Sequence, residues 1–63
     1  MKRISILIVD DHAIVRTGLR SLLGTQPDLE VVAEADDGAS AMREALRHRP
    51  DVIVMDLMMP QKD

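Results

Sequence analysis

The sequence predicts an α/β fold in which three strands and two helices alternate as β-α-β-α-β. Two short runs, residues 4–9 and 52–55, are almost wholly apolar and rich in β-branched side chains, as in strands buried on both faces. Two longer segments, residues 13–23 and 39–48, carry apolar residues at helical spacing. Such alternation implies a parallel sheet whose strands are joined by crossover helices.

The first strand, residues 4–9, stops abruptly at Asp10, and an amphipathic helix is expected over residues 13–23. The apolar side of this helix holds Ile14, Val15, Leu19, Leu22 and Leu23. Its polar side holds Arg16, Thr17, Arg20 and Ser21. Gly18 inside the helix is expected to allow close packing on the sheet. Gly24 stands where a C-terminal cap is expected, and Pro27 prevents the helix from continuing.

The second strand, residues 29–35, is more polar than the others, and its acidic residues suit a sheet edge. Asp36 and Asp37 are interpreted as turn and cap residues before the second helix, residues 39–48. Pro50 ends that helix. The third strand, residues 52–55, is again wholly apolar and is followed at once by Asp56.

The arrangement of the strands predicts where the acidic residues meet. Right-handed crossovers and the apolar character of the first strand favour the order 2-1-3, with one helix on each face of the sheet. Asp10 and Asp11 then follow the first strand and Asp56 follows its neighbour, roughly 5 Å away. Open α/β sheets bind ligands at this switch point, outside the carboxyl ends of the strands.

Three carboxylates in one place repel one another unless one is protonated or a cation neutralises them. Hard oxygen ligands with no His or Cys nearby favour Mg²⁺ over zinc, and a carboxylate beside such a metal can act as a nucleophile toward phosphorus. A purely structural interpretation, in which Asp10 or Asp11 caps the first helix, is compatible with a role in the cation site. His12 is interpreted as a polar residue of the first helical turn.

Composition excludes several classes of function. The chain has 63 residues, no Cys, no aromatic residue and a formal net charge of −3. Disulfides are therefore impossible, and the charge does not support nucleic-acid binding by this segment. The longest apolar run, residues 6–9, is too short to cross a membrane, and no signal-peptide core follows the start, so we interpret the protein as cytoplasmic. A nucleotide-binding role is disfavoured because no Gly-rich phosphate loop follows the first strand.

Two motifs resemble those of response-regulator receiver domains. Residues 6–12, Ile-Leu-Ile-Val-Asp-Asp-His, resemble the opening of such domains, and residues 54–60, Val-Met-Asp-Leu-Met-Met-Pro, resemble their phosphoacceptor signature. Residues 15–20 and 27–35 resemble the branch with a LuxR/FixJ/NarL-type helix-turn-helix output domain. The resemblance covers the whole chain and implies a flavodoxin-like, doubly wound parallel sheet.

The resemblance also implies roles for single residues. Asp56 would be the phosphorylated nucleophile, Asp11 would bind Mg²⁺ directly, Asp10 would bind it mainly through water, and the backbone carbonyl of Met58 would complete the protein's ligands. A sensor histidine kinase would be the phosphodonor. Residues 1–63 would form a partial receiver domain, without its switch Ser or Thr, its Lys, or a DNA-binding output domain through which the parent would control transcription.

Three other expectations remain open from the sequence. A Mg²⁺-dependent aspartyl phosphatase or phosphotransferase is disfavoured because Asp10-Asp11 is not the Asp-x-Asp of haloacid-dehalogenase phosphatases, and receiver domains catalyse only their own phosphorylation and dephosphorylation. The chain is alternatively a structural half-domain fragment without activity. Finally, two copies could associate through the apolar edge of the third strand.

Overall fold

The structure, a computed structural model, describes residues 2–55. Its five elements follow the predicted order, with β1 at Ile4–Val9, α1 at Ala13–Gly24, β2 at Leu29–Ala35, α2 at Gly38–His48 and β3 at Val52–Met55. The alternation of strands and helices expected from the sequence is therefore confirmed. None of the helices in these residues has the length and hydropathy that a membrane crossing requires.

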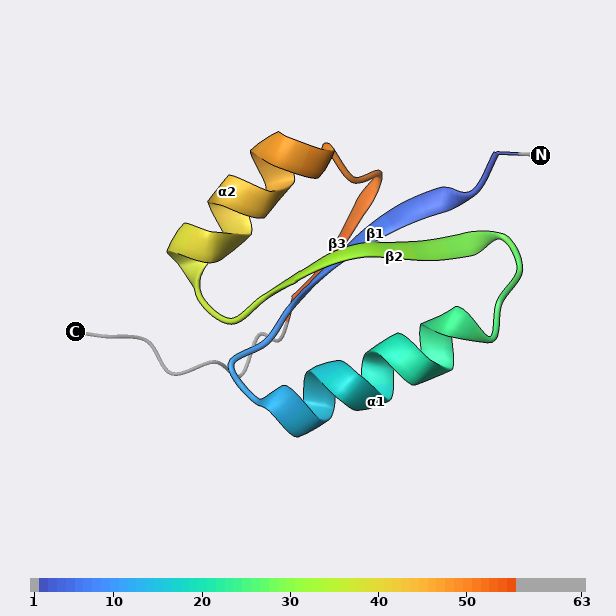
Figure 1. The fold of residues 1–63 in the computed structure, drawn as a ribbon, viewed down its shortest axis with the longest axis horizontal. Helices are drawn as coiled ribbons and strands as arrows, with labels where there is room; N and C mark the ends of the chain where they lie inside the picture. The colour runs from blue at the N-terminus through green and yellow to red at the C-terminus, as the bar shows by residue number, and fades with distance from the viewer. Residues whose placement is uncertain (1, 56–63) are drawn as a thin grey trace.

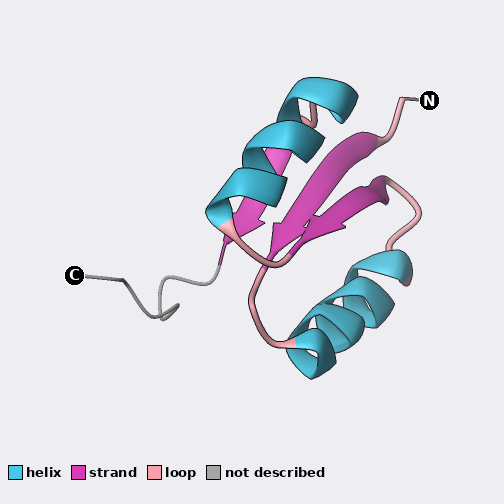
Figure 2. Cartoon of the chain, turned by 60° about the vertical axis from the view of Figure 1, so that its left-hand side comes forward, coloured by secondary structure: helices cyan, strands magenta, loops and turns pink. Residues whose placement is uncertain are grey.

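The three strands form one parallel sheet in the order β2-β1-β3, which confirms the predicted order. Figure 1 shows α1 on one face of this sheet and α2 on the other. In Figure 2 the strands run side by side between the two helices. Both crossovers lead from one end of the sheet to the other, so β1, β2 and β3 all finish at the same edge.

The pairing of β1 with β2 contains one irregularity. Ile6 pairs with Val31, but the next residue, Leu7, pairs with Ala33. Strand β2 therefore carries one extra residue, which is a β-bulge. Beyond the bulge Val9 pairs with Ala35, so β1 and β2 end level with each other at the carboxyl edge.

The core is centred on β1, because the middle strand is covered by both helices. Ile6, Leu7, Ile8 and Val9 are all at most 3% exposed. On the α2 side, Leu7 and Val9 form a cluster with Ala35 and Ala41. Burial of this kind explains why β1 is apolar at every core position rather than alternating.

The residues that α1 buries differ from its predicted apolar face. Leu19 and Leu23 are half-buried, but Ile14 is 83% and Leu22 64% exposed in the described residues. The side chain of Arg16, predicted on the polar side, is only 20% exposed. The packing role expected of Gly18 is wrong, because a Cβ built there would meet nothing within 4 Å.

The helix ends also differ from the predictions in detail. Gly24 is the last residue of α1 rather than its cap; the cap is Thr25, whose backbone N–H and hydroxyl both donate to the carbonyl of Leu22. Asp37 caps α2 as expected, and it forms a capping box with Ser40. The helix therefore begins at Gly38, one residue earlier than predicted.

Strand β3 pairs with β1 on one side and leaves its other side uncovered by the described residues. Val52, Ile53 and Met55 are 45–50% exposed. This exposure is the feature on which association of two copies would depend, and that association stays a prediction.

Candidate functional site

The candidate site lies at the carboxyl edge of the sheet, where β1 and β3 end beside each other. Val9, the last residue of β1, pairs with Met55, the last residue of β3. Asp10 follows Val9, and Asp56 follows Met55. The register thus aligns the residues that precede the two predicted site acids. Asp56 itself and Met58 lie outside the described residues.

Asp10 is held firmly although it is an acidic residue that is only 1% exposed. Its backbone N–H donates to the carbonyl of Ala35 at 3.0 Å, which extends the sheet by one hydrogen bond. Its Oδ1 accepts a hydrogen bond from the backbone N–H of His12 at 2.7 Å. Burial of a carboxylate is costly without such partners, so the loop geometry is what allows an acid here.

His12 lies closer to the acids than the sequence suggested. It occupies the N-cap position of α1 rather than the first helical turn, and its side chain makes no capping hydrogen bond. Its Nδ1 lies 3.0 Å from Oδ1 of Asp10 and 2.8 Å from Oδ1 of Asp11. Ionised carboxylate oxygens only accept, so in the tautomer that carries a proton on Nδ1 this atom donates between two groups that would otherwise repel each other.

The donor set suits a divalent cation. One ligand atom from each of Asp10, Asp11 and His12 lies within 4.8 Å of the others. The carboxylate of Asp10 is buried and that of Asp11 is about one-third exposed, at 34%. Carboxylate oxygens at an open loop edge fit Mg²⁺, which keeps several waters and takes one or two protein carboxylates. The predicted roles of Asp10 and Asp11 are therefore compatible with the geometry.

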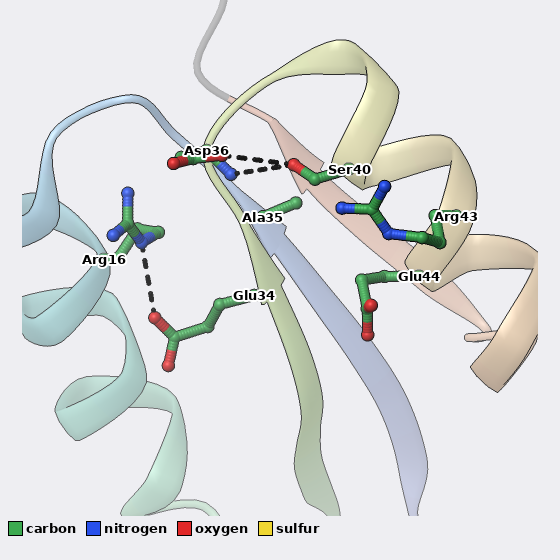
Figure 3. Close-up of a pocket in the computed structure, with 7 residues that line it drawn as sticks. All are labelled: Arg16, Glu34, Ala35, Asp36, Ser40, Arg43 and Glu44. Atoms are coloured by element: carbon green, nitrogen blue, oxygen red, sulfur yellow. Dashed lines mark hydrogen bonds and ion pairs between the residues drawn. The ribbon is translucent and has the colours of Figure 1, made fainter.

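Arg16 is a site residue that the sequence analysis missed. Its Nη1 donates to the backbone carbonyl of Asp10 at 2.7 Å, and its Nε lies 3.4 Å from Oε1 of Glu34 on β2. Figure 3 shows the guanidinium of Arg16 directed at Glu34 across the end of the sheet. Arg20 reaches the other oxygen of Glu34 at 3.1 Å. The only sequence signal was an arginine six residues after Asp10, the first acid of the pair.

A polar cavity of about 270 Å³ adjoins this edge between α1 and α2. Figure 3 shows Arg16 and Glu34 on its α1 side and Ser40, Arg43 and Glu44 on its α2 side. The hydroxyl of Ser40 faces Asp36 and belongs to the cap of α2. Acidic and basic groups are mixed in this cavity, so its charge does not select one class of ligand.

A family model described as the response regulator receiver domain matches residues 6–63. The chain is 56% identical over 55 residues to the oxygen regulatory protein NreC of Staphylococcus epidermidis, covering 87% of the chain and 25% of that protein. It is 50% identical over 60 residues to the transcriptional regulatory protein LiaR of Bacillus subtilis, covering 95% of the chain and 28% of that protein.

A solved structure agrees with these relatives. The response regulator domain of Thermotoga maritima CheB superposes with a TM-score of 0.88 at 42% identity, covering 98% of the chain and 46% of that domain. The chain therefore spans about a quarter of the curated relatives it matches and less than half of the solved domain.

Proposed function

The chain belongs to the family of response regulator receiver domains, and from that premise we propose that Asp56 accepts a phosphoryl group in a reaction that needs Mg²⁺. Phosphorylation of Asp56 would change the state of the receiver and so control an output in the longer parent protein. The module is then a signalling switch that modifies only itself: the bond from phosphorus to the phosphodonor breaks, the donor leaves without its phosphoryl group, and no other substrate is converted.

The observation that carries this proposal is the geometry of the carboxyl edge. A buried Asp10 and a partly exposed Asp11 follow β1, whose last residue pairs with the residue before Asp56. Acids on adjacent strands at a switch point supply both a cation site and a nucleophile. Asp11 would bind Mg²⁺ directly, Asp10 mainly through water, and the carbonyl of Met58 would contribute the remaining protein ligand. Mg²⁺ would neutralise charge on the transferring phosphoryl group.

This chain's own residues have distinct tasks in the proposal. Asp56 supplies the attacking carboxylate oxygen. The hydrogen bond from the His12 amide fixes the Asp10 carboxylate, and the sheet hydrogen bond to Ala35 fixes its backbone. The loop is thus organised before any ligand arrives, which reduces the cost of ordering it on binding.

The relatives suggest the setting of the parent protein. NreC is named an oxygen regulatory protein and LiaR a transcriptional regulatory protein. We propose that a sensor histidine kinase is the phosphodonor. The parent protein would act on transcription through a DNA-binding output domain outside these 63 residues, and the parent would work in the cytoplasm.

Phosphorylation of the intact receiver domain by acetyl phosphate tests the proposal. With Mg²⁺ present, intact mass should show one added phosphoryl group, and none should appear with a chelator. Asp56→Asn should abolish the addition. Two control variants should still gain the phosphoryl group. Asp28→Asn removes an exposed acid at the opposite end of the sheet, and His12→Ala removes the imidazole beside the acids.

Two results would contradict the assignment. A label that survives Asp56→Asn places the phosphoryl group on another residue. If the wild-type label is acid-labile phosphohistidine and it is lost in His12→Ala, the acceptor is His12. Hydrolysis of an added phosphate ester by the wild-type domain would favour the rival phosphatase instead.

A further inference from the structure

We propose that Arg16 is a positioning residue for the cation site: its guanidinium holds the backbone of Asp10 against β2 and thereby raises the affinity for Mg²⁺. The inference rests on the proposed function, because it concerns the same site. Arg16 would act on the cation only through Asp10 and would touch neither the cation nor the phosphoryl group.

The contacts of Arg16 join two elements that are distant in sequence. Nη1 donates to the carbonyl of Asp10 in the loop after β1, and Nε pairs with Glu34 near the end of β2. The Arg16 side chain is 20% and the Glu34 side chain 28% exposed, so water screens this connection less than it would screen a surface pair. An arginine suits this task because its rigid fork can donate in two directions at once.

The consequence for the site follows from the other bonds of Asp10. Its N–H is already bound to Ala35 and its carboxylate to the His12 amide. The bond from Arg16 fixes the carbonyl, the remaining polar group of the residue. Without Arg16 the peptide between Asp10 and Asp11 loses one restraint, and both carboxylates lose part of their preset geometry. A site less ordered before binding holds its cation more weakly.

Electrostatics alone predicts the opposite sign. A guanidinium near a cation site repels the cation, so removing its charge should strengthen Mg²⁺ binding. A positioning role predicts weaker binding despite the lost repulsion. The direction of the change in affinity therefore separates positioning from a plain charge effect.

The matched control is Arg20. It pairs with the same Glu34, at 3.1 Å, from one turn further along α1. Its side chain is 69% exposed, and the Asp10 carbonyl is bound by Arg16 instead. Arg20→Gln removes one positive charge beside the Glu34 carboxylate, as Arg16→Gln does, but leaves the hydrogen bond from Arg16 to the Asp10 carbonyl in place.

The test is calorimetric titration of Mg²⁺ into the intact receiver domain and its Arg16→Gln, Arg16→Lys and Arg20→Gln variants, each shown to be folded by circular dichroism. Loss of an outer support of a metal ligand typically weakens affinity by about 10-fold or more, and we expect about 10-fold for Arg16→Gln. Arg20→Gln should bind as wild type or slightly more tightly. At saturating Mg²⁺ the phosphorylation of Arg16→Gln should recover, because its nucleophile is intact.

A second measurement reports on the loop without a cation. Amide hydrogen exchange of His12 should be faster in the metal-free Arg16 variants than in wild type, and unchanged in Arg20→Gln. Should Arg16→Gln not fold, Arg16→Lys decides, because it keeps the charge but replaces the planar fork by a single point donor, so any weakening is positional.

Unchanged or tighter Mg²⁺ binding in folded Arg16→Lys and Arg16→Gln would overturn the inference, as would equal weakening in Arg20→Gln. The proposed function would survive each of these results. If the wild-type domain itself neither bound Mg²⁺ nor accepted phosphate, the proposed function would fail instead.

Discussion

Ser5 and Asp51 form a reciprocal hydrogen-bonded pair although they lie 46 residues apart in the chain. Oδ2 of Asp51 accepts from the backbone N–H of Ser5 at 2.9 Å and from its hydroxyl at 3.0 Å, and the N–H of Asp51 donates to Ser5 in return. The pair lies near the starts of β1 and β3, at the end of the sheet opposite the candidate site. It immediately precedes Ile6 and Val52, the first pair of the register that ends with Val9 and Met55.

This pair makes stability depend on pH. The Ser5 amide, and after it the Ser5 hydroxyl, hold the pKa of Asp51 below its usual value. A carboxyl whose pKa is lower in the folded state stabilises the fold fully above the unfolded-state pKa, about 3.9, and this stability is lost as the pH falls through the folded value. Ser5→Ala should therefore raise the pKa of Asp51. It should also reduce the stability that the protein loses when the pH is lowered from neutral to below about 3.9.

Carboxyl chemical shifts of Asp51 followed by NMR across this range measure the pKa, and urea unfolding at each pH measures the stability. Ser21→Ala is the matched control, because Ser21 is exposed on α1 and is not among the hydrogen-bond partners of Asp51. An Asp51 pKa that is the same in Ser5→Ala and wild type would show that the hydroxyl contributes nothing.

The cap of α2 provides a second prediction. Oδ1 of Asp37 accepts from the backbone N–H of Ser40 at 2.7 Å, and the Ser40 hydroxyl turns back toward the amide of Asp37 at 3.3 Å. The Ser40 amide is the main reason that the pKa of Asp37 lies below its usual value. Asp37→Ala should lower the free energy of unfolding and shorten α2, whereas Asp37→Ser should restore most of the loss because serine is also a good N-cap.

Urea unfolding and the amide exchange of Ala39 and Ser40 measure these effects. Asp28→Ala is the control, because Asp28 is an exposed acid in the loop before β2, outside any helix. Equal stability of Asp37→Ala and wild type would mean that the capping box does not stabilise α2.

The sheet was predictable because its signals are local and strong. Residues 4–9 and 52–55 are apolar without alternation, and each stops at an acid, which indicates both buried parallel strands and their carboxyl ends. The handedness of crossovers then leaves few arrangements, and the observed order β2-β1-β3 is the economical one. The placement of Asp10 and Asp11 at the candidate site follows from those two facts.

The fine structure of the site was not predictable because it depends on contacts between distant residues. Helical periodicity assigns Arg16 to a polar face, but its side chain turns back onto the sheet, where it contacts the backbone carbonyl of Asp10 and the carboxylate of Glu34. The same periodicity cannot show that Ile14 and Leu22 remain exposed in the described residues, because exposure depends on what covers the helix. The position of His12 depends on the turn after β1.

Mg²⁺ should raise the melting temperature of the intact receiver domain, because a ligand that binds only the folded state stabilises it by about 2.7 kcal/mol at 100 times its dissociation constant. Asp11→Asn should weaken this effect. The same substitution should raise the melting temperature without Mg²⁺, because it removes the like-charge repulsion between the neighbouring carboxylates of Asp10 and Asp11. Melts followed by far-UV circular dichroism, with and without Mg²⁺, give all four values.

Calcium and a monovalent salt at matched ionic strength separate site binding from screening. Asp28→Asn removes the same charge far from the site and should leave the Mg²⁺ effect intact. A melting temperature that does not respond to Mg²⁺ in wild type would contradict the cation site.

Arg49, just past the end of α2, holds a left-handed backbone conformation at φ 47 and ψ 59, and its N–H donates to the carbonyl of Ala45 at 2.8 Å. A residue with a Cβ pays roughly 1–2 kcal/mol in this region, whereas glycine adopts it freely. Arg49→Gly should therefore raise the free energy of unfolding by about 0.5–1 kcal/mol, after the greater freedom of glycine in the unfolded chain is subtracted.

Arg47→Gly is the matched control, because it removes the same side chain and the same charge two residues earlier, inside α2. There glycine loses helix propensity, so the free energy of unfolding should fall by about 0.5–1 kcal/mol. Urea unfolding of the two variants should thus give shifts of opposite sign. If both substitutions destabilised the protein, the prediction would be wrong, and the Arg49 side chain would contribute more to the fold than its left-handed backbone costs.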